Sequence, residues 1–175
     1  MAKRRERKQE VELRGSIDRF MPKGQFAVML GDDEGRPLWK RPVIIDNAVA
    51  TVGRAWLLKH VMSTNSSAVS TQIITAIAIG TGTNVTPSST DTALSSEISR
   101  VAYTTETDNT TSTTGPNVIW AASWATNSGN GNISEVGLFN TTQATAGTLL
   151  AHATFAASFL KTTSNTLTVS YTFNV

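Results

Sequence analysis

The chain has no cysteine, little charge over most of its length and no long apolar run. Without cysteine it can form no disulfide framework, no thiolate nucleophile and no cysteine-based zinc site. No run of 18 apolar residues is present to span a membrane, and no apolar segment follows the charged residues 3–8 to act as a signal peptide. We therefore expect a protein that is neither secreted by the usual route nor membrane-spanning, and that is stabilised by packing and self-association.

Charge is especially scarce in residues 62–175, which contain seven charged side chains: Asp91, Glu97, Arg100, Glu106, Asp108, Glu135 and Lys161. Thr, Ser and Asn supply 52 of these 114 positions. Soluble monomers usually keep a mixed-charge surface, which suppresses association. A hydroxyl-rich, nearly uncharged and β-prone surface is typical of a chain packed against copies of itself or against partners. The composition therefore predicts an assembled structural protein.

Basic residues concentrate near the N-terminus, where residues 1–41 contain 11 of the 15 Lys and Arg residues and 7 of the 13 Asp and Glu residues. Residues 1–15 form an arm that is too polar to bury itself and needs a partner to become ordered. We interpret it as a docking element whose predicted partner-docking residues are Lys3, Arg4, Arg5, Arg7 and Lys8. Interleaved glutamates and the lack of aromatic residues favour an acidic patch of a neighbouring protein, with nucleic-acid phosphates as the alternative.

Hydrophobic periodicity predicts a mainly β protein. Residues 25–45 have the pattern of a β-hairpin, and residues 48–62 have that of one amphipathic helix. Further strand-like runs are residues 72–79, 100–106, 117–126, 133–140, 148–155 and 166–173. Many short strands separated by turn signals favour an antiparallel β-sandwich or jelly roll.

These patterns divide the chain into three parts. Residues 1–15 are the extended N-terminal arm, residues 16–62 a β-hairpin plus the helix, and residues 63–175 the β-sandwich domain. One full-sized core fits a chain of 175 residues.

Several stretches carry a family-like pattern: residues 77–83 (IAIGTGT), residues 91–94 (DTAL) with Glu97 and Arg100, residues 133–140 (ISEVGLFN) and residues 147–155 (GTLLAHATF). The segment 47–62 leads into them. This pattern resembles structural proteins of tailed bacteriophages, including fibre, collar and capsid-accessory proteins. The resemblance implies a component of the phage particle, and the arm lies outside the pattern.

Aromatic residues suggest packing surfaces. Trp120 and Trp124 lie four residues apart, on one face of a predicted strand. Aligned rings can form a sugar-stacking platform, but a buried or interface face uses the same pattern more often. We therefore predict packing or interface roles for Trp120 and Trp124, and a packing role for Trp56.

The run 133–140 carries apolar groups on both faces, which predicts an interior strand or one at a subunit interface. By alternation, one face holds Ile133, Glu135, Gly137 and Phe139. Gly137 lacks a side chain in the middle of this run, so a large ring can approach it, and a tryptophan is the expected one. Gly137 and Phe139 are therefore predicted packing or interface residues.

No constellation of acid, base and nucleophile emerges from the chain. Two histidines, His60 and His152, cannot form a structural zinc site without cysteine, and His152 is expected at the surface or in a cross-strand polar pair. The acids at positions 91, 97, 106 and 108 are interpreted as solvated loop carboxylates rather than as a glycosidase pair. We expect no enzymatic activity, no cofactor and no metal.

Together these interpretations predict a non-enzymatic structural component of a tailed-phage virion, assembled in the host cytoplasm. It would assemble symmetrically as a capsid decoration or as a neck or tail-attachment protein, docked by its arm. The expected partners are copies of itself and virion proteins of the capsid, portal, neck or tail, and no membrane. Two alternatives stay open: a carbohydrate-binding adhesin, or receptor-binding fibre module, and an internal virion protein that contacts DNA.

Overall fold

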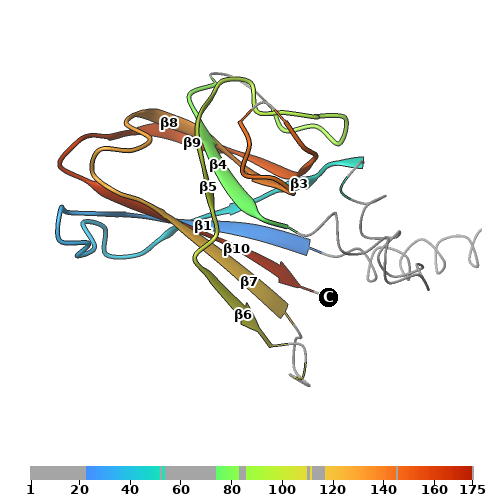
Figure 1. Cartoon of the computed structure of the whole chain (residues 1–175), viewed down its shortest axis with the longest axis horizontal. Helices are drawn as coiled ribbons and strands as arrows, with labels where there is room; N and C mark the ends of the chain where they lie inside the picture. Colours follow the sequence, from blue (N-terminus) through green and yellow to red (C-terminus); the bar gives the residue numbers. More distant parts are fainter. Residues whose placement is uncertain are drawn as a thin grey trace, which may run out of the picture.

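This computed structural model describes residues 23–51, 53, 74–82, 86–109, 111, 117–144 and 146–174. Within these residues the chain forms ten β-strands. Figure 1 shows their arrangement. In chain order they are β1 (Lys23–Gly31), β2 (Val43–Asp46), β3 (Ala48–Val49), β4 (Ala76–Gly80), β5 (Glu97–Ala102), β6 (Thr105–Asp108), β7 (Asn117–Trp124), β8 (Gly131–Phe139), β9 (Leu149–Lys161) and β10 (Thr166–Asn174).

The strands form two five-stranded sheets (Figure 1). Sheet A has the order β2-β1-β10-β7-β6, and sheet B has the order β3-β9-β8-β4-β5. Every pairing within both sheets is antiparallel. The predicted fold class, a mainly β antiparallel sandwich, is confirmed.

The predicted hairpin is also confirmed, because β1 pairs antiparallel with β2. Gly35, at a φ of 80°, lies in the connection, where any other residue would be strained. Asp32 closes the turn by accepting hydrogen bonds from two backbone N–H groups. On its other side β1 pairs with β10 along its whole length. The hairpin of residues 16–62 thus contributes its strands to the same sandwich as residues 63–175.

The predicted helix does not begin at residue 48. Residues 48 and 49 instead form β3, which pairs with β9 at the edge of sheet B. Thr51 and Gly53 have a helical backbone conformation. The other residues of the predicted helix, including Trp56, lie outside the described residues, and so does the arm of residues 1–15.

Alternation along the strands builds the core between the two sheets. In β10, Leu167, Val169 and Tyr171 are buried, while the residues between them carry hydroxyl groups and are more exposed. β4 is buried at every residue because it lies inside sheet B with both faces covered. Phe26 of β1 and Trp124 of β7 are among the largest fully buried side chains. Removal of these apolar surfaces from water supplies most of the stabilisation.

The single strand predicted for residues 100–106 is wrong. This run belongs to two strands in different sheets, β5 in sheet B and β6 at the edge of sheet A. The chain crosses between the sheets at Tyr103 and Thr104, whose backbone N–H groups donate to the carbonyl groups of Thr75 and Ala121. Periodicity could not reveal the crossing, because only two residues separate the partly buried β5 from the exposed β6.

An irregularity in the pairing of β8 with β9 changes which side chains of β8 share a face. Between the pairs Ile133–Phe159 and Glu135–Thr154, β8 advances by two residues while β9 advances by five, and Ile133 joins Val136 and Leu138 in the core between the sheets. The prediction that Ile133 shares the face of Glu135 is therefore wrong, because regular alternation does not continue across this irregularity. The prediction of an interior strand is confirmed, since β8 lies between β9 and β4.

Candidate functional site

A second, smaller core lies on the outer face of sheet B, the face turned away from sheet A. Ala78, Leu94, Phe139 and Leu149 are buried together there, and we call them the outer cluster. They alternate along their strands with residues of the core between the sheets, as the two faces of a sheet require. Leu94 comes from residues 86–96, called the covering segment, which lies over this face before β5 begins.

Glu135 holds the covering segment on sheet B. Its side chain is fully buried, and its Oε1 accepts hydrogen bonds from the backbone N–H groups of Gly82 and Ser96 at 3.1 and 2.7 Å. Its Oε2 accepts one from the backbone N–H of Ser95 at 3.0 Å and lies 3.2 Å from His152 Nε2. Four partners therefore compensate for the burial of this carboxylate.

His152 links Glu135 to the covering segment. It is buried on β9, and its Nδ1 lies 2.7 Å from Oδ2 of Asp91. Burial opposes the charged imidazolium, but hydrogen bonds to Glu135 and Asp91 outweigh it, so the pKa of His152 lies above its ordinary value. Burial also opposes the charged carboxylates, yet backbone and His152 hydrogen bonds leave the pKa of both acids below their ordinary values.

This acid–histidine–acid network has little capacity for catalysis. A general base needs a nitrogen lone pair within reach of a substrate proton. Both ring nitrogens of His152 face carboxylates, and the side chain is only 1% exposed. Among the described residues, no group of three or more His, Cys, Asp or Glu is arranged to hold a metal ion. The network is suited instead to fastening the covering segment.

The network predicts a stability maximum in mildly acidic solution. His152 contributes stability that is complete below its ordinary pKa of 6.5 and is lost as pH rises through its higher folded value. Asp91 and Glu135 contribute stability that is complete above their ordinary values of 3.8 and 4.5 and is lost as pH falls through their lower folded values. We expect the free energy of unfolding, measured by urea titration, to be highest between pH 4.5 and 6.5.

The variant His152→Gln provides the control for this pH profile. Glutamine cannot titrate, so the decline in unfolding free energy above pH 6.5 should disappear relative to the unmodified chain. An unchanged alkaline decline in the variant would show that another group causes it.

Arg100 fastens a second loop beside the outer cluster. Its guanidinium lies 3.5 Å from the centre of the Phe139 ring and pairs with both oxygens of Glu97 at 2.9 and 2.6 Å. Its Nη1 also donates to three backbone carbonyl groups between residues 141 and 146. Arg100 thus joins β5 to the connection between β8 and β9.

Gly137 has the close neighbours that its position in β8 predicted, but no tryptophan is among the nearest. A Cβ at Gly137 would lie within 3.0 Å of side-chain atoms of Leu94, Leu149 and Phe139. All three belong to the outer cluster. The absence of a side chain at Gly137 therefore leaves room for Leu94 to contact the sheet. The aromatic ring beside Gly137 belongs to Phe139 and not to a tryptophan.

Sequence reasoning did not recognise that Asp91, Glu97 and Glu135 take part in the contacts that hold loops on sheet B. Asp91 is bonded to His152, and Glu97 pairs with Arg100 within β5, so the interpretation of these two acids as solvated loop carboxylates is wrong. His152 is not a surface residue, but its predicted cross-strand polar pairing is present, with Glu135 on β8. One signal was available, because Glu135 stands in an otherwise apolar run, where a carboxylate must find buried donors.

The surface that residues 63–175 contribute to the sandwich carries fewer charges than their composition suggests, whereas most charged residues of the β1–β2 hairpin are exposed. Glu135 and Lys161 are buried, and the side chain of Arg100 is 2% exposed. Nζ of Lys161 donates to the Ala125 carbonyl and to Oδ1 of Asn130, and burial lowers the pKa of Lys161. Of the seven charged residues after residue 62, the exposed ones are Glu106 and Asp108, both on β6.

The two tryptophans of β7 both face sheet B. Trp124 is 1% exposed within the core, and its Nε1 donates to Oγ of Ser99 at 2.9 Å. Trp120 is partly buried and lies 6.3 Å, ring centre to ring centre, from Tyr171 in a stacked arrangement. An exposed sugar-stacking platform made of Trp120 and Trp124 is therefore wrong, because their rings lie between the two sheets.

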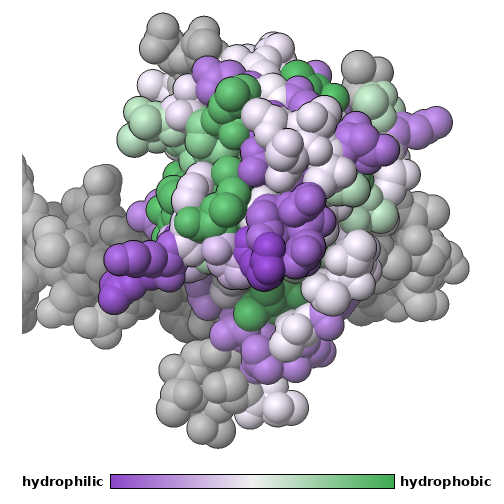
Figure 2. Space-filling model, turned by 90° about the vertical axis from the view of Figure 1, so that its left-hand side faces the viewer, coloured by the Kyte–Doolittle hydropathy of each residue, from purple (hydrophilic) through white to green (hydrophobic). Residues whose placement is uncertain are grey.

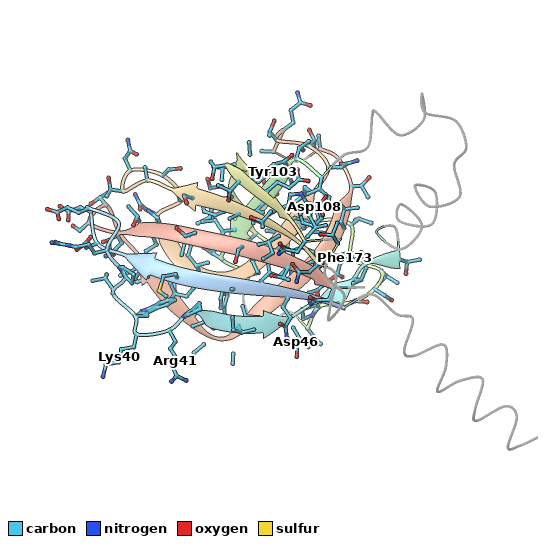
Figure 3. All side chains as sticks on the ribbon, turned by 90° about the horizontal axis from the view of Figure 1, so that it is seen from below. Lys40, Arg41, Asp46, Tyr103, Asp108 and Phe173 are labelled. Carbon is cyan, nitrogen blue, oxygen red and sulfur yellow. The ribbon has the colours of Figure 1, made fainter. Side chains whose placement is uncertain are left out.

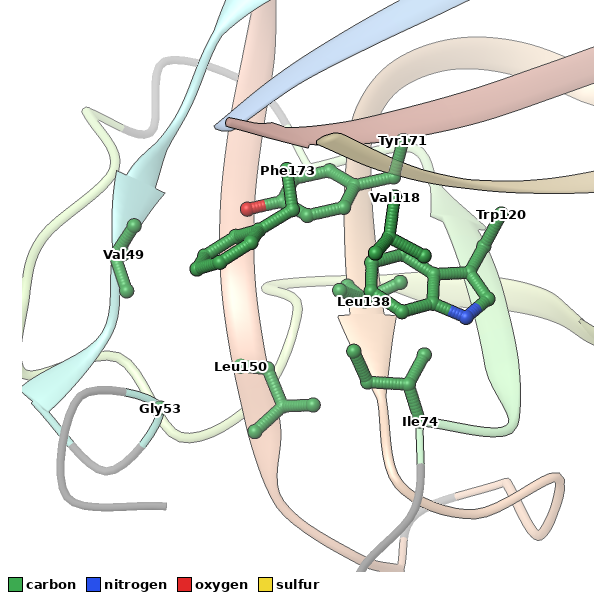
Figure 4. Close-up of a pocket in the computed structure, with 9 residues that line it drawn as sticks. All are labelled: Val49, Gly53, Ile74, Val118, Trp120, Leu138, Leu150, Tyr171 and Phe173. Atoms are coloured by element: carbon green, nitrogen blue, oxygen red, sulfur yellow. The ribbon is translucent and has the colours of Figure 1, made fainter. Parts of the chain in front are cut away.

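Trp120 also lines a pocket of about 220 Å³ between the sheets. Figure 4 shows its lining side chains, which are apolar or aromatic. The lining residues are Val49, Gly53, Ile74, Val118, Trp120, Leu138, Leu150, Tyr171 and Phe173. Such a lining suits an apolar group and offers few partners for the hydroxyl groups of a sugar.

Comparison of the chain with protein-family models, with curated proteins and with solved structures found no match. Within the described residues, no helix has the length and apolar character needed to cross a membrane.

Proposed function

We propose that this chain is a non-enzymatic structural component of a tailed-phage virion. It assembles symmetrically on the particle, as a capsid decoration or a neck or tail-attachment protein, and docks through its N-terminal arm. The observation that carries the proposal is the nearly uncharged surface that residues 63–175 contribute to the sandwich, where the exposed charges are Glu106 and Asp108. A neighbour can cover such a surface with little cost in charge desolvation.

Figure 2 illustrates this surface on one side of the molecule. Pale areas, the colour of residues of intermediate hydropathy such as Thr and Ser, lie between hydrophobic and hydrophilic patches, one of which is a large hydrophilic patch near the centre of this view. Solubility as a monomer usually depends on interspersed charges of both signs. This surface therefore supports the proposal that the protein functions while packed against neighbouring subunits.

The positions of the pattern residues support a structural role. Asp91 and Glu135, both within the phage-like pattern, meet at His152, and Glu97 meets Arg100 beside the outer cluster. The first contact fastens the covering segment to sheet B, and Arg100, oriented by Glu97, fastens the connection between β8 and β9. The pattern is thus explained as a set of fold-determining contacts, which proteins at several virion positions can share.

The arm provides a direct test of docking. A variant with Lys3, Arg4, Arg5, Arg7 and Lys8 all changed to glutamine should lose at least about tenfold in occupancy on purified particles, because it loses the five clustered cations of the docking arm. Occupancy is measured by quantitative immunoblot of purified virions, and the position by electron microscopy of a tagged chain. Absence of the unmodified chain from purified particles would overturn the proposed function.

The same experiment distinguishes the two partners considered for the arm. If the arm binds a virion protein, emptying the particles of DNA should leave the occupancy of the unmodified chain unchanged. If the arm binds phosphates, occupancy should fall when DNA is removed and should decrease steeply with salt.

A further inference from the structure

The β2 edge of sheet A combines exposed apolar and charged side chains. The described residues include five exposed large hydrophobic side chains, and three of them, Leu38, Val43 and Ile44, lie along this edge at 52%, 41% and 54% exposure. Leu38 belongs to the edge because its backbone N–H donates to the Leu30 carbonyl of β1, beside which β2 also lies. Together with Lys40, Arg41 and Asp46 these residues form what we call the edge patch.

The charges of the edge patch are ordered along the chain. Lys40 and Arg41 precede β2, and Asp46 ends it; Figure 3 shows the basic pair and Asp46 towards opposite ends of this strand. Oδ1 of Asp46 accepts a hydrogen bond from Nε2 of Gln25, which holds the carboxylate in place. In the described part of the chain, neither Lys40 nor Arg41 has an ion-pair partner.

The loop that carries the basic pair is anchored. Trp39, directly before Lys40, packs edge-on against Phe159 of β9, with ring centres 5.0 Å apart. A surface held in one conformation before association loses less entropy when it binds.

We propose that the edge patch is an isologous interface, in which β2 of one copy pairs antiparallel with β2 of a second copy. Antiparallel pairing of identical strands places the start of each strand beside the end of the other. Lys40 and Arg41 of each copy then approach Asp46 of the other copy, while Val43 and Ile44 lie at the centre of the contact, on opposite faces of the joined sheet. A two-fold interface requires one self-complementary surface, and the order of charges in the edge patch has this property.

The opposite edge of sheet A does not fit a second copy in the same way. β6 carries Glu106 and Asp108 between threonines, so pairing it with itself would bring carboxylates together. Short acidic edges of this kind prevent unwanted strand pairing. The edge patch differs because its centre is apolar and its charges have both signs.

This inference names one contact of the proposed symmetric assembly, and its biological purpose rests on that proposed function. The contact would join two A sheets into one continuous sheet across the two-fold axis. Other surfaces of the sandwich would remain available for virion partners.

Sedimentation equilibrium of the full chain tests the interface. The variant Ile44→Lys places a charge at the centre of the contact and should raise the dimer dissociation constant about tenfold or more. The matched control is Leu160→Lys on β9 of sheet B, where the side chain is 61% exposed, and it should leave the dissociation constant unchanged. Circular dichroism verifies that both variants fold.

A charge swap makes the test specific for self-pairing. The double variant Lys40→Glu/Arg41→Glu and the single variant Asp46→Lys should each stay monomeric, because each brings like charges together in its own dimer. Mixing the two variants should restore dimers, since every charge contact is then opposite in sign.

A mixture that stays monomeric, or association of the unmodified chain that is insensitive to Ile44→Lys, would overturn the interface. A monomeric unmodified chain at micromolar concentration would overturn it too, as would dimers in which the edge patch binds a different surface of the second copy. These failures are separate from that of the proposed function. A chain that occupies virions without β2 pairing contradicts this inference alone, whereas β2 dimers absent from virions contradict the proposed function alone.

Discussion

Replacing Trp124 by alanine is expected to lower the free energy of unfolding by about 3–5 kcal/mol. The side chain is 1% exposed, lies in the core between the sheets and donates a hydrogen bond to Ser99. Its removal leaves a cavity and an unpartnered hydroxyl group, and both add to the lost transfer free energy. Urea unfolding, monitored by circular dichroism, measures the change. Tryptophan fluorescence is less suitable, because the variant has one tryptophan fewer than the unmodified chain.

Trp120→Ala is the matched control on the same face of β7. Trp120 is only partly buried and borders a pocket that is already open, so its removal creates less new cavity. We expect its cost to be at least about 1 kcal/mol smaller than that of Trp124→Ala. Equal losses for the two variants would contradict the assignment of Trp124 to the centre of the core.

Replacing Glu135 by glutamine is expected to cost about 3–5 kcal/mol, although the two side chains have nearly the same shape. Glutamine has an amide NH₂ group in place of one carboxylate oxygen, so a donor would face backbone N–H donors of Gly82, Ser95 or Ser96. The change also leaves the buried imidazole of His152 with one carboxylate instead of two. Chemical denaturation at pH 6 measures this loss.

Glu34→Gln is the control for removing a carboxylate. The side chain of Glu34 is 67% exposed in its pair with Arg36, and exposed pairs contribute about 0–1 kcal/mol. A loss of similar size in both variants would show that net charge, rather than the buried hydrogen bonds, determines the effect. A small loss in Glu135→Gln alone would show that the covering segment is held mainly by Leu94.

The hairpin and the regular strands could be predicted because their signals are local. Leu167, Val169 and Tyr171 alternate with hydroxyl-bearing residues, and a two-residue period is characteristic of a strand with one buried face. The glycine-containing turn before β2 is equally local. Where an irregularity interrupts the period, as between Ile133 and Glu135, the same reasoning assigned the wrong face.

The anchoring contacts could not be predicted, because they join residues far apart in the chain. Asp91 and His152 are 61 positions apart, and Arg100 reaches carbonyl groups more than 40 positions away. Composition shows how many charged residues exist but not which ones are buried. The scarcity of charged residues therefore indicated a nearly uncharged surface. Only the fold determines that the side chains of Glu135, Lys161 and Arg100 are buried.

The amino-acid sequence by itself determined that the chain is built mainly of β-strands, that it has no cysteine chemistry and that its hydroxyl-rich second half carries few charges. These properties follow from residue counts and from short-range alternation, which need no knowledge of distant contacts. Only the tertiary structure decided which sheet each strand joins, which charges are buried, and that β2 presents apolar and oppositely charged groups along one edge of sheet A. Such features depend on strand order and register, which arise when segments distant in the chain pack together.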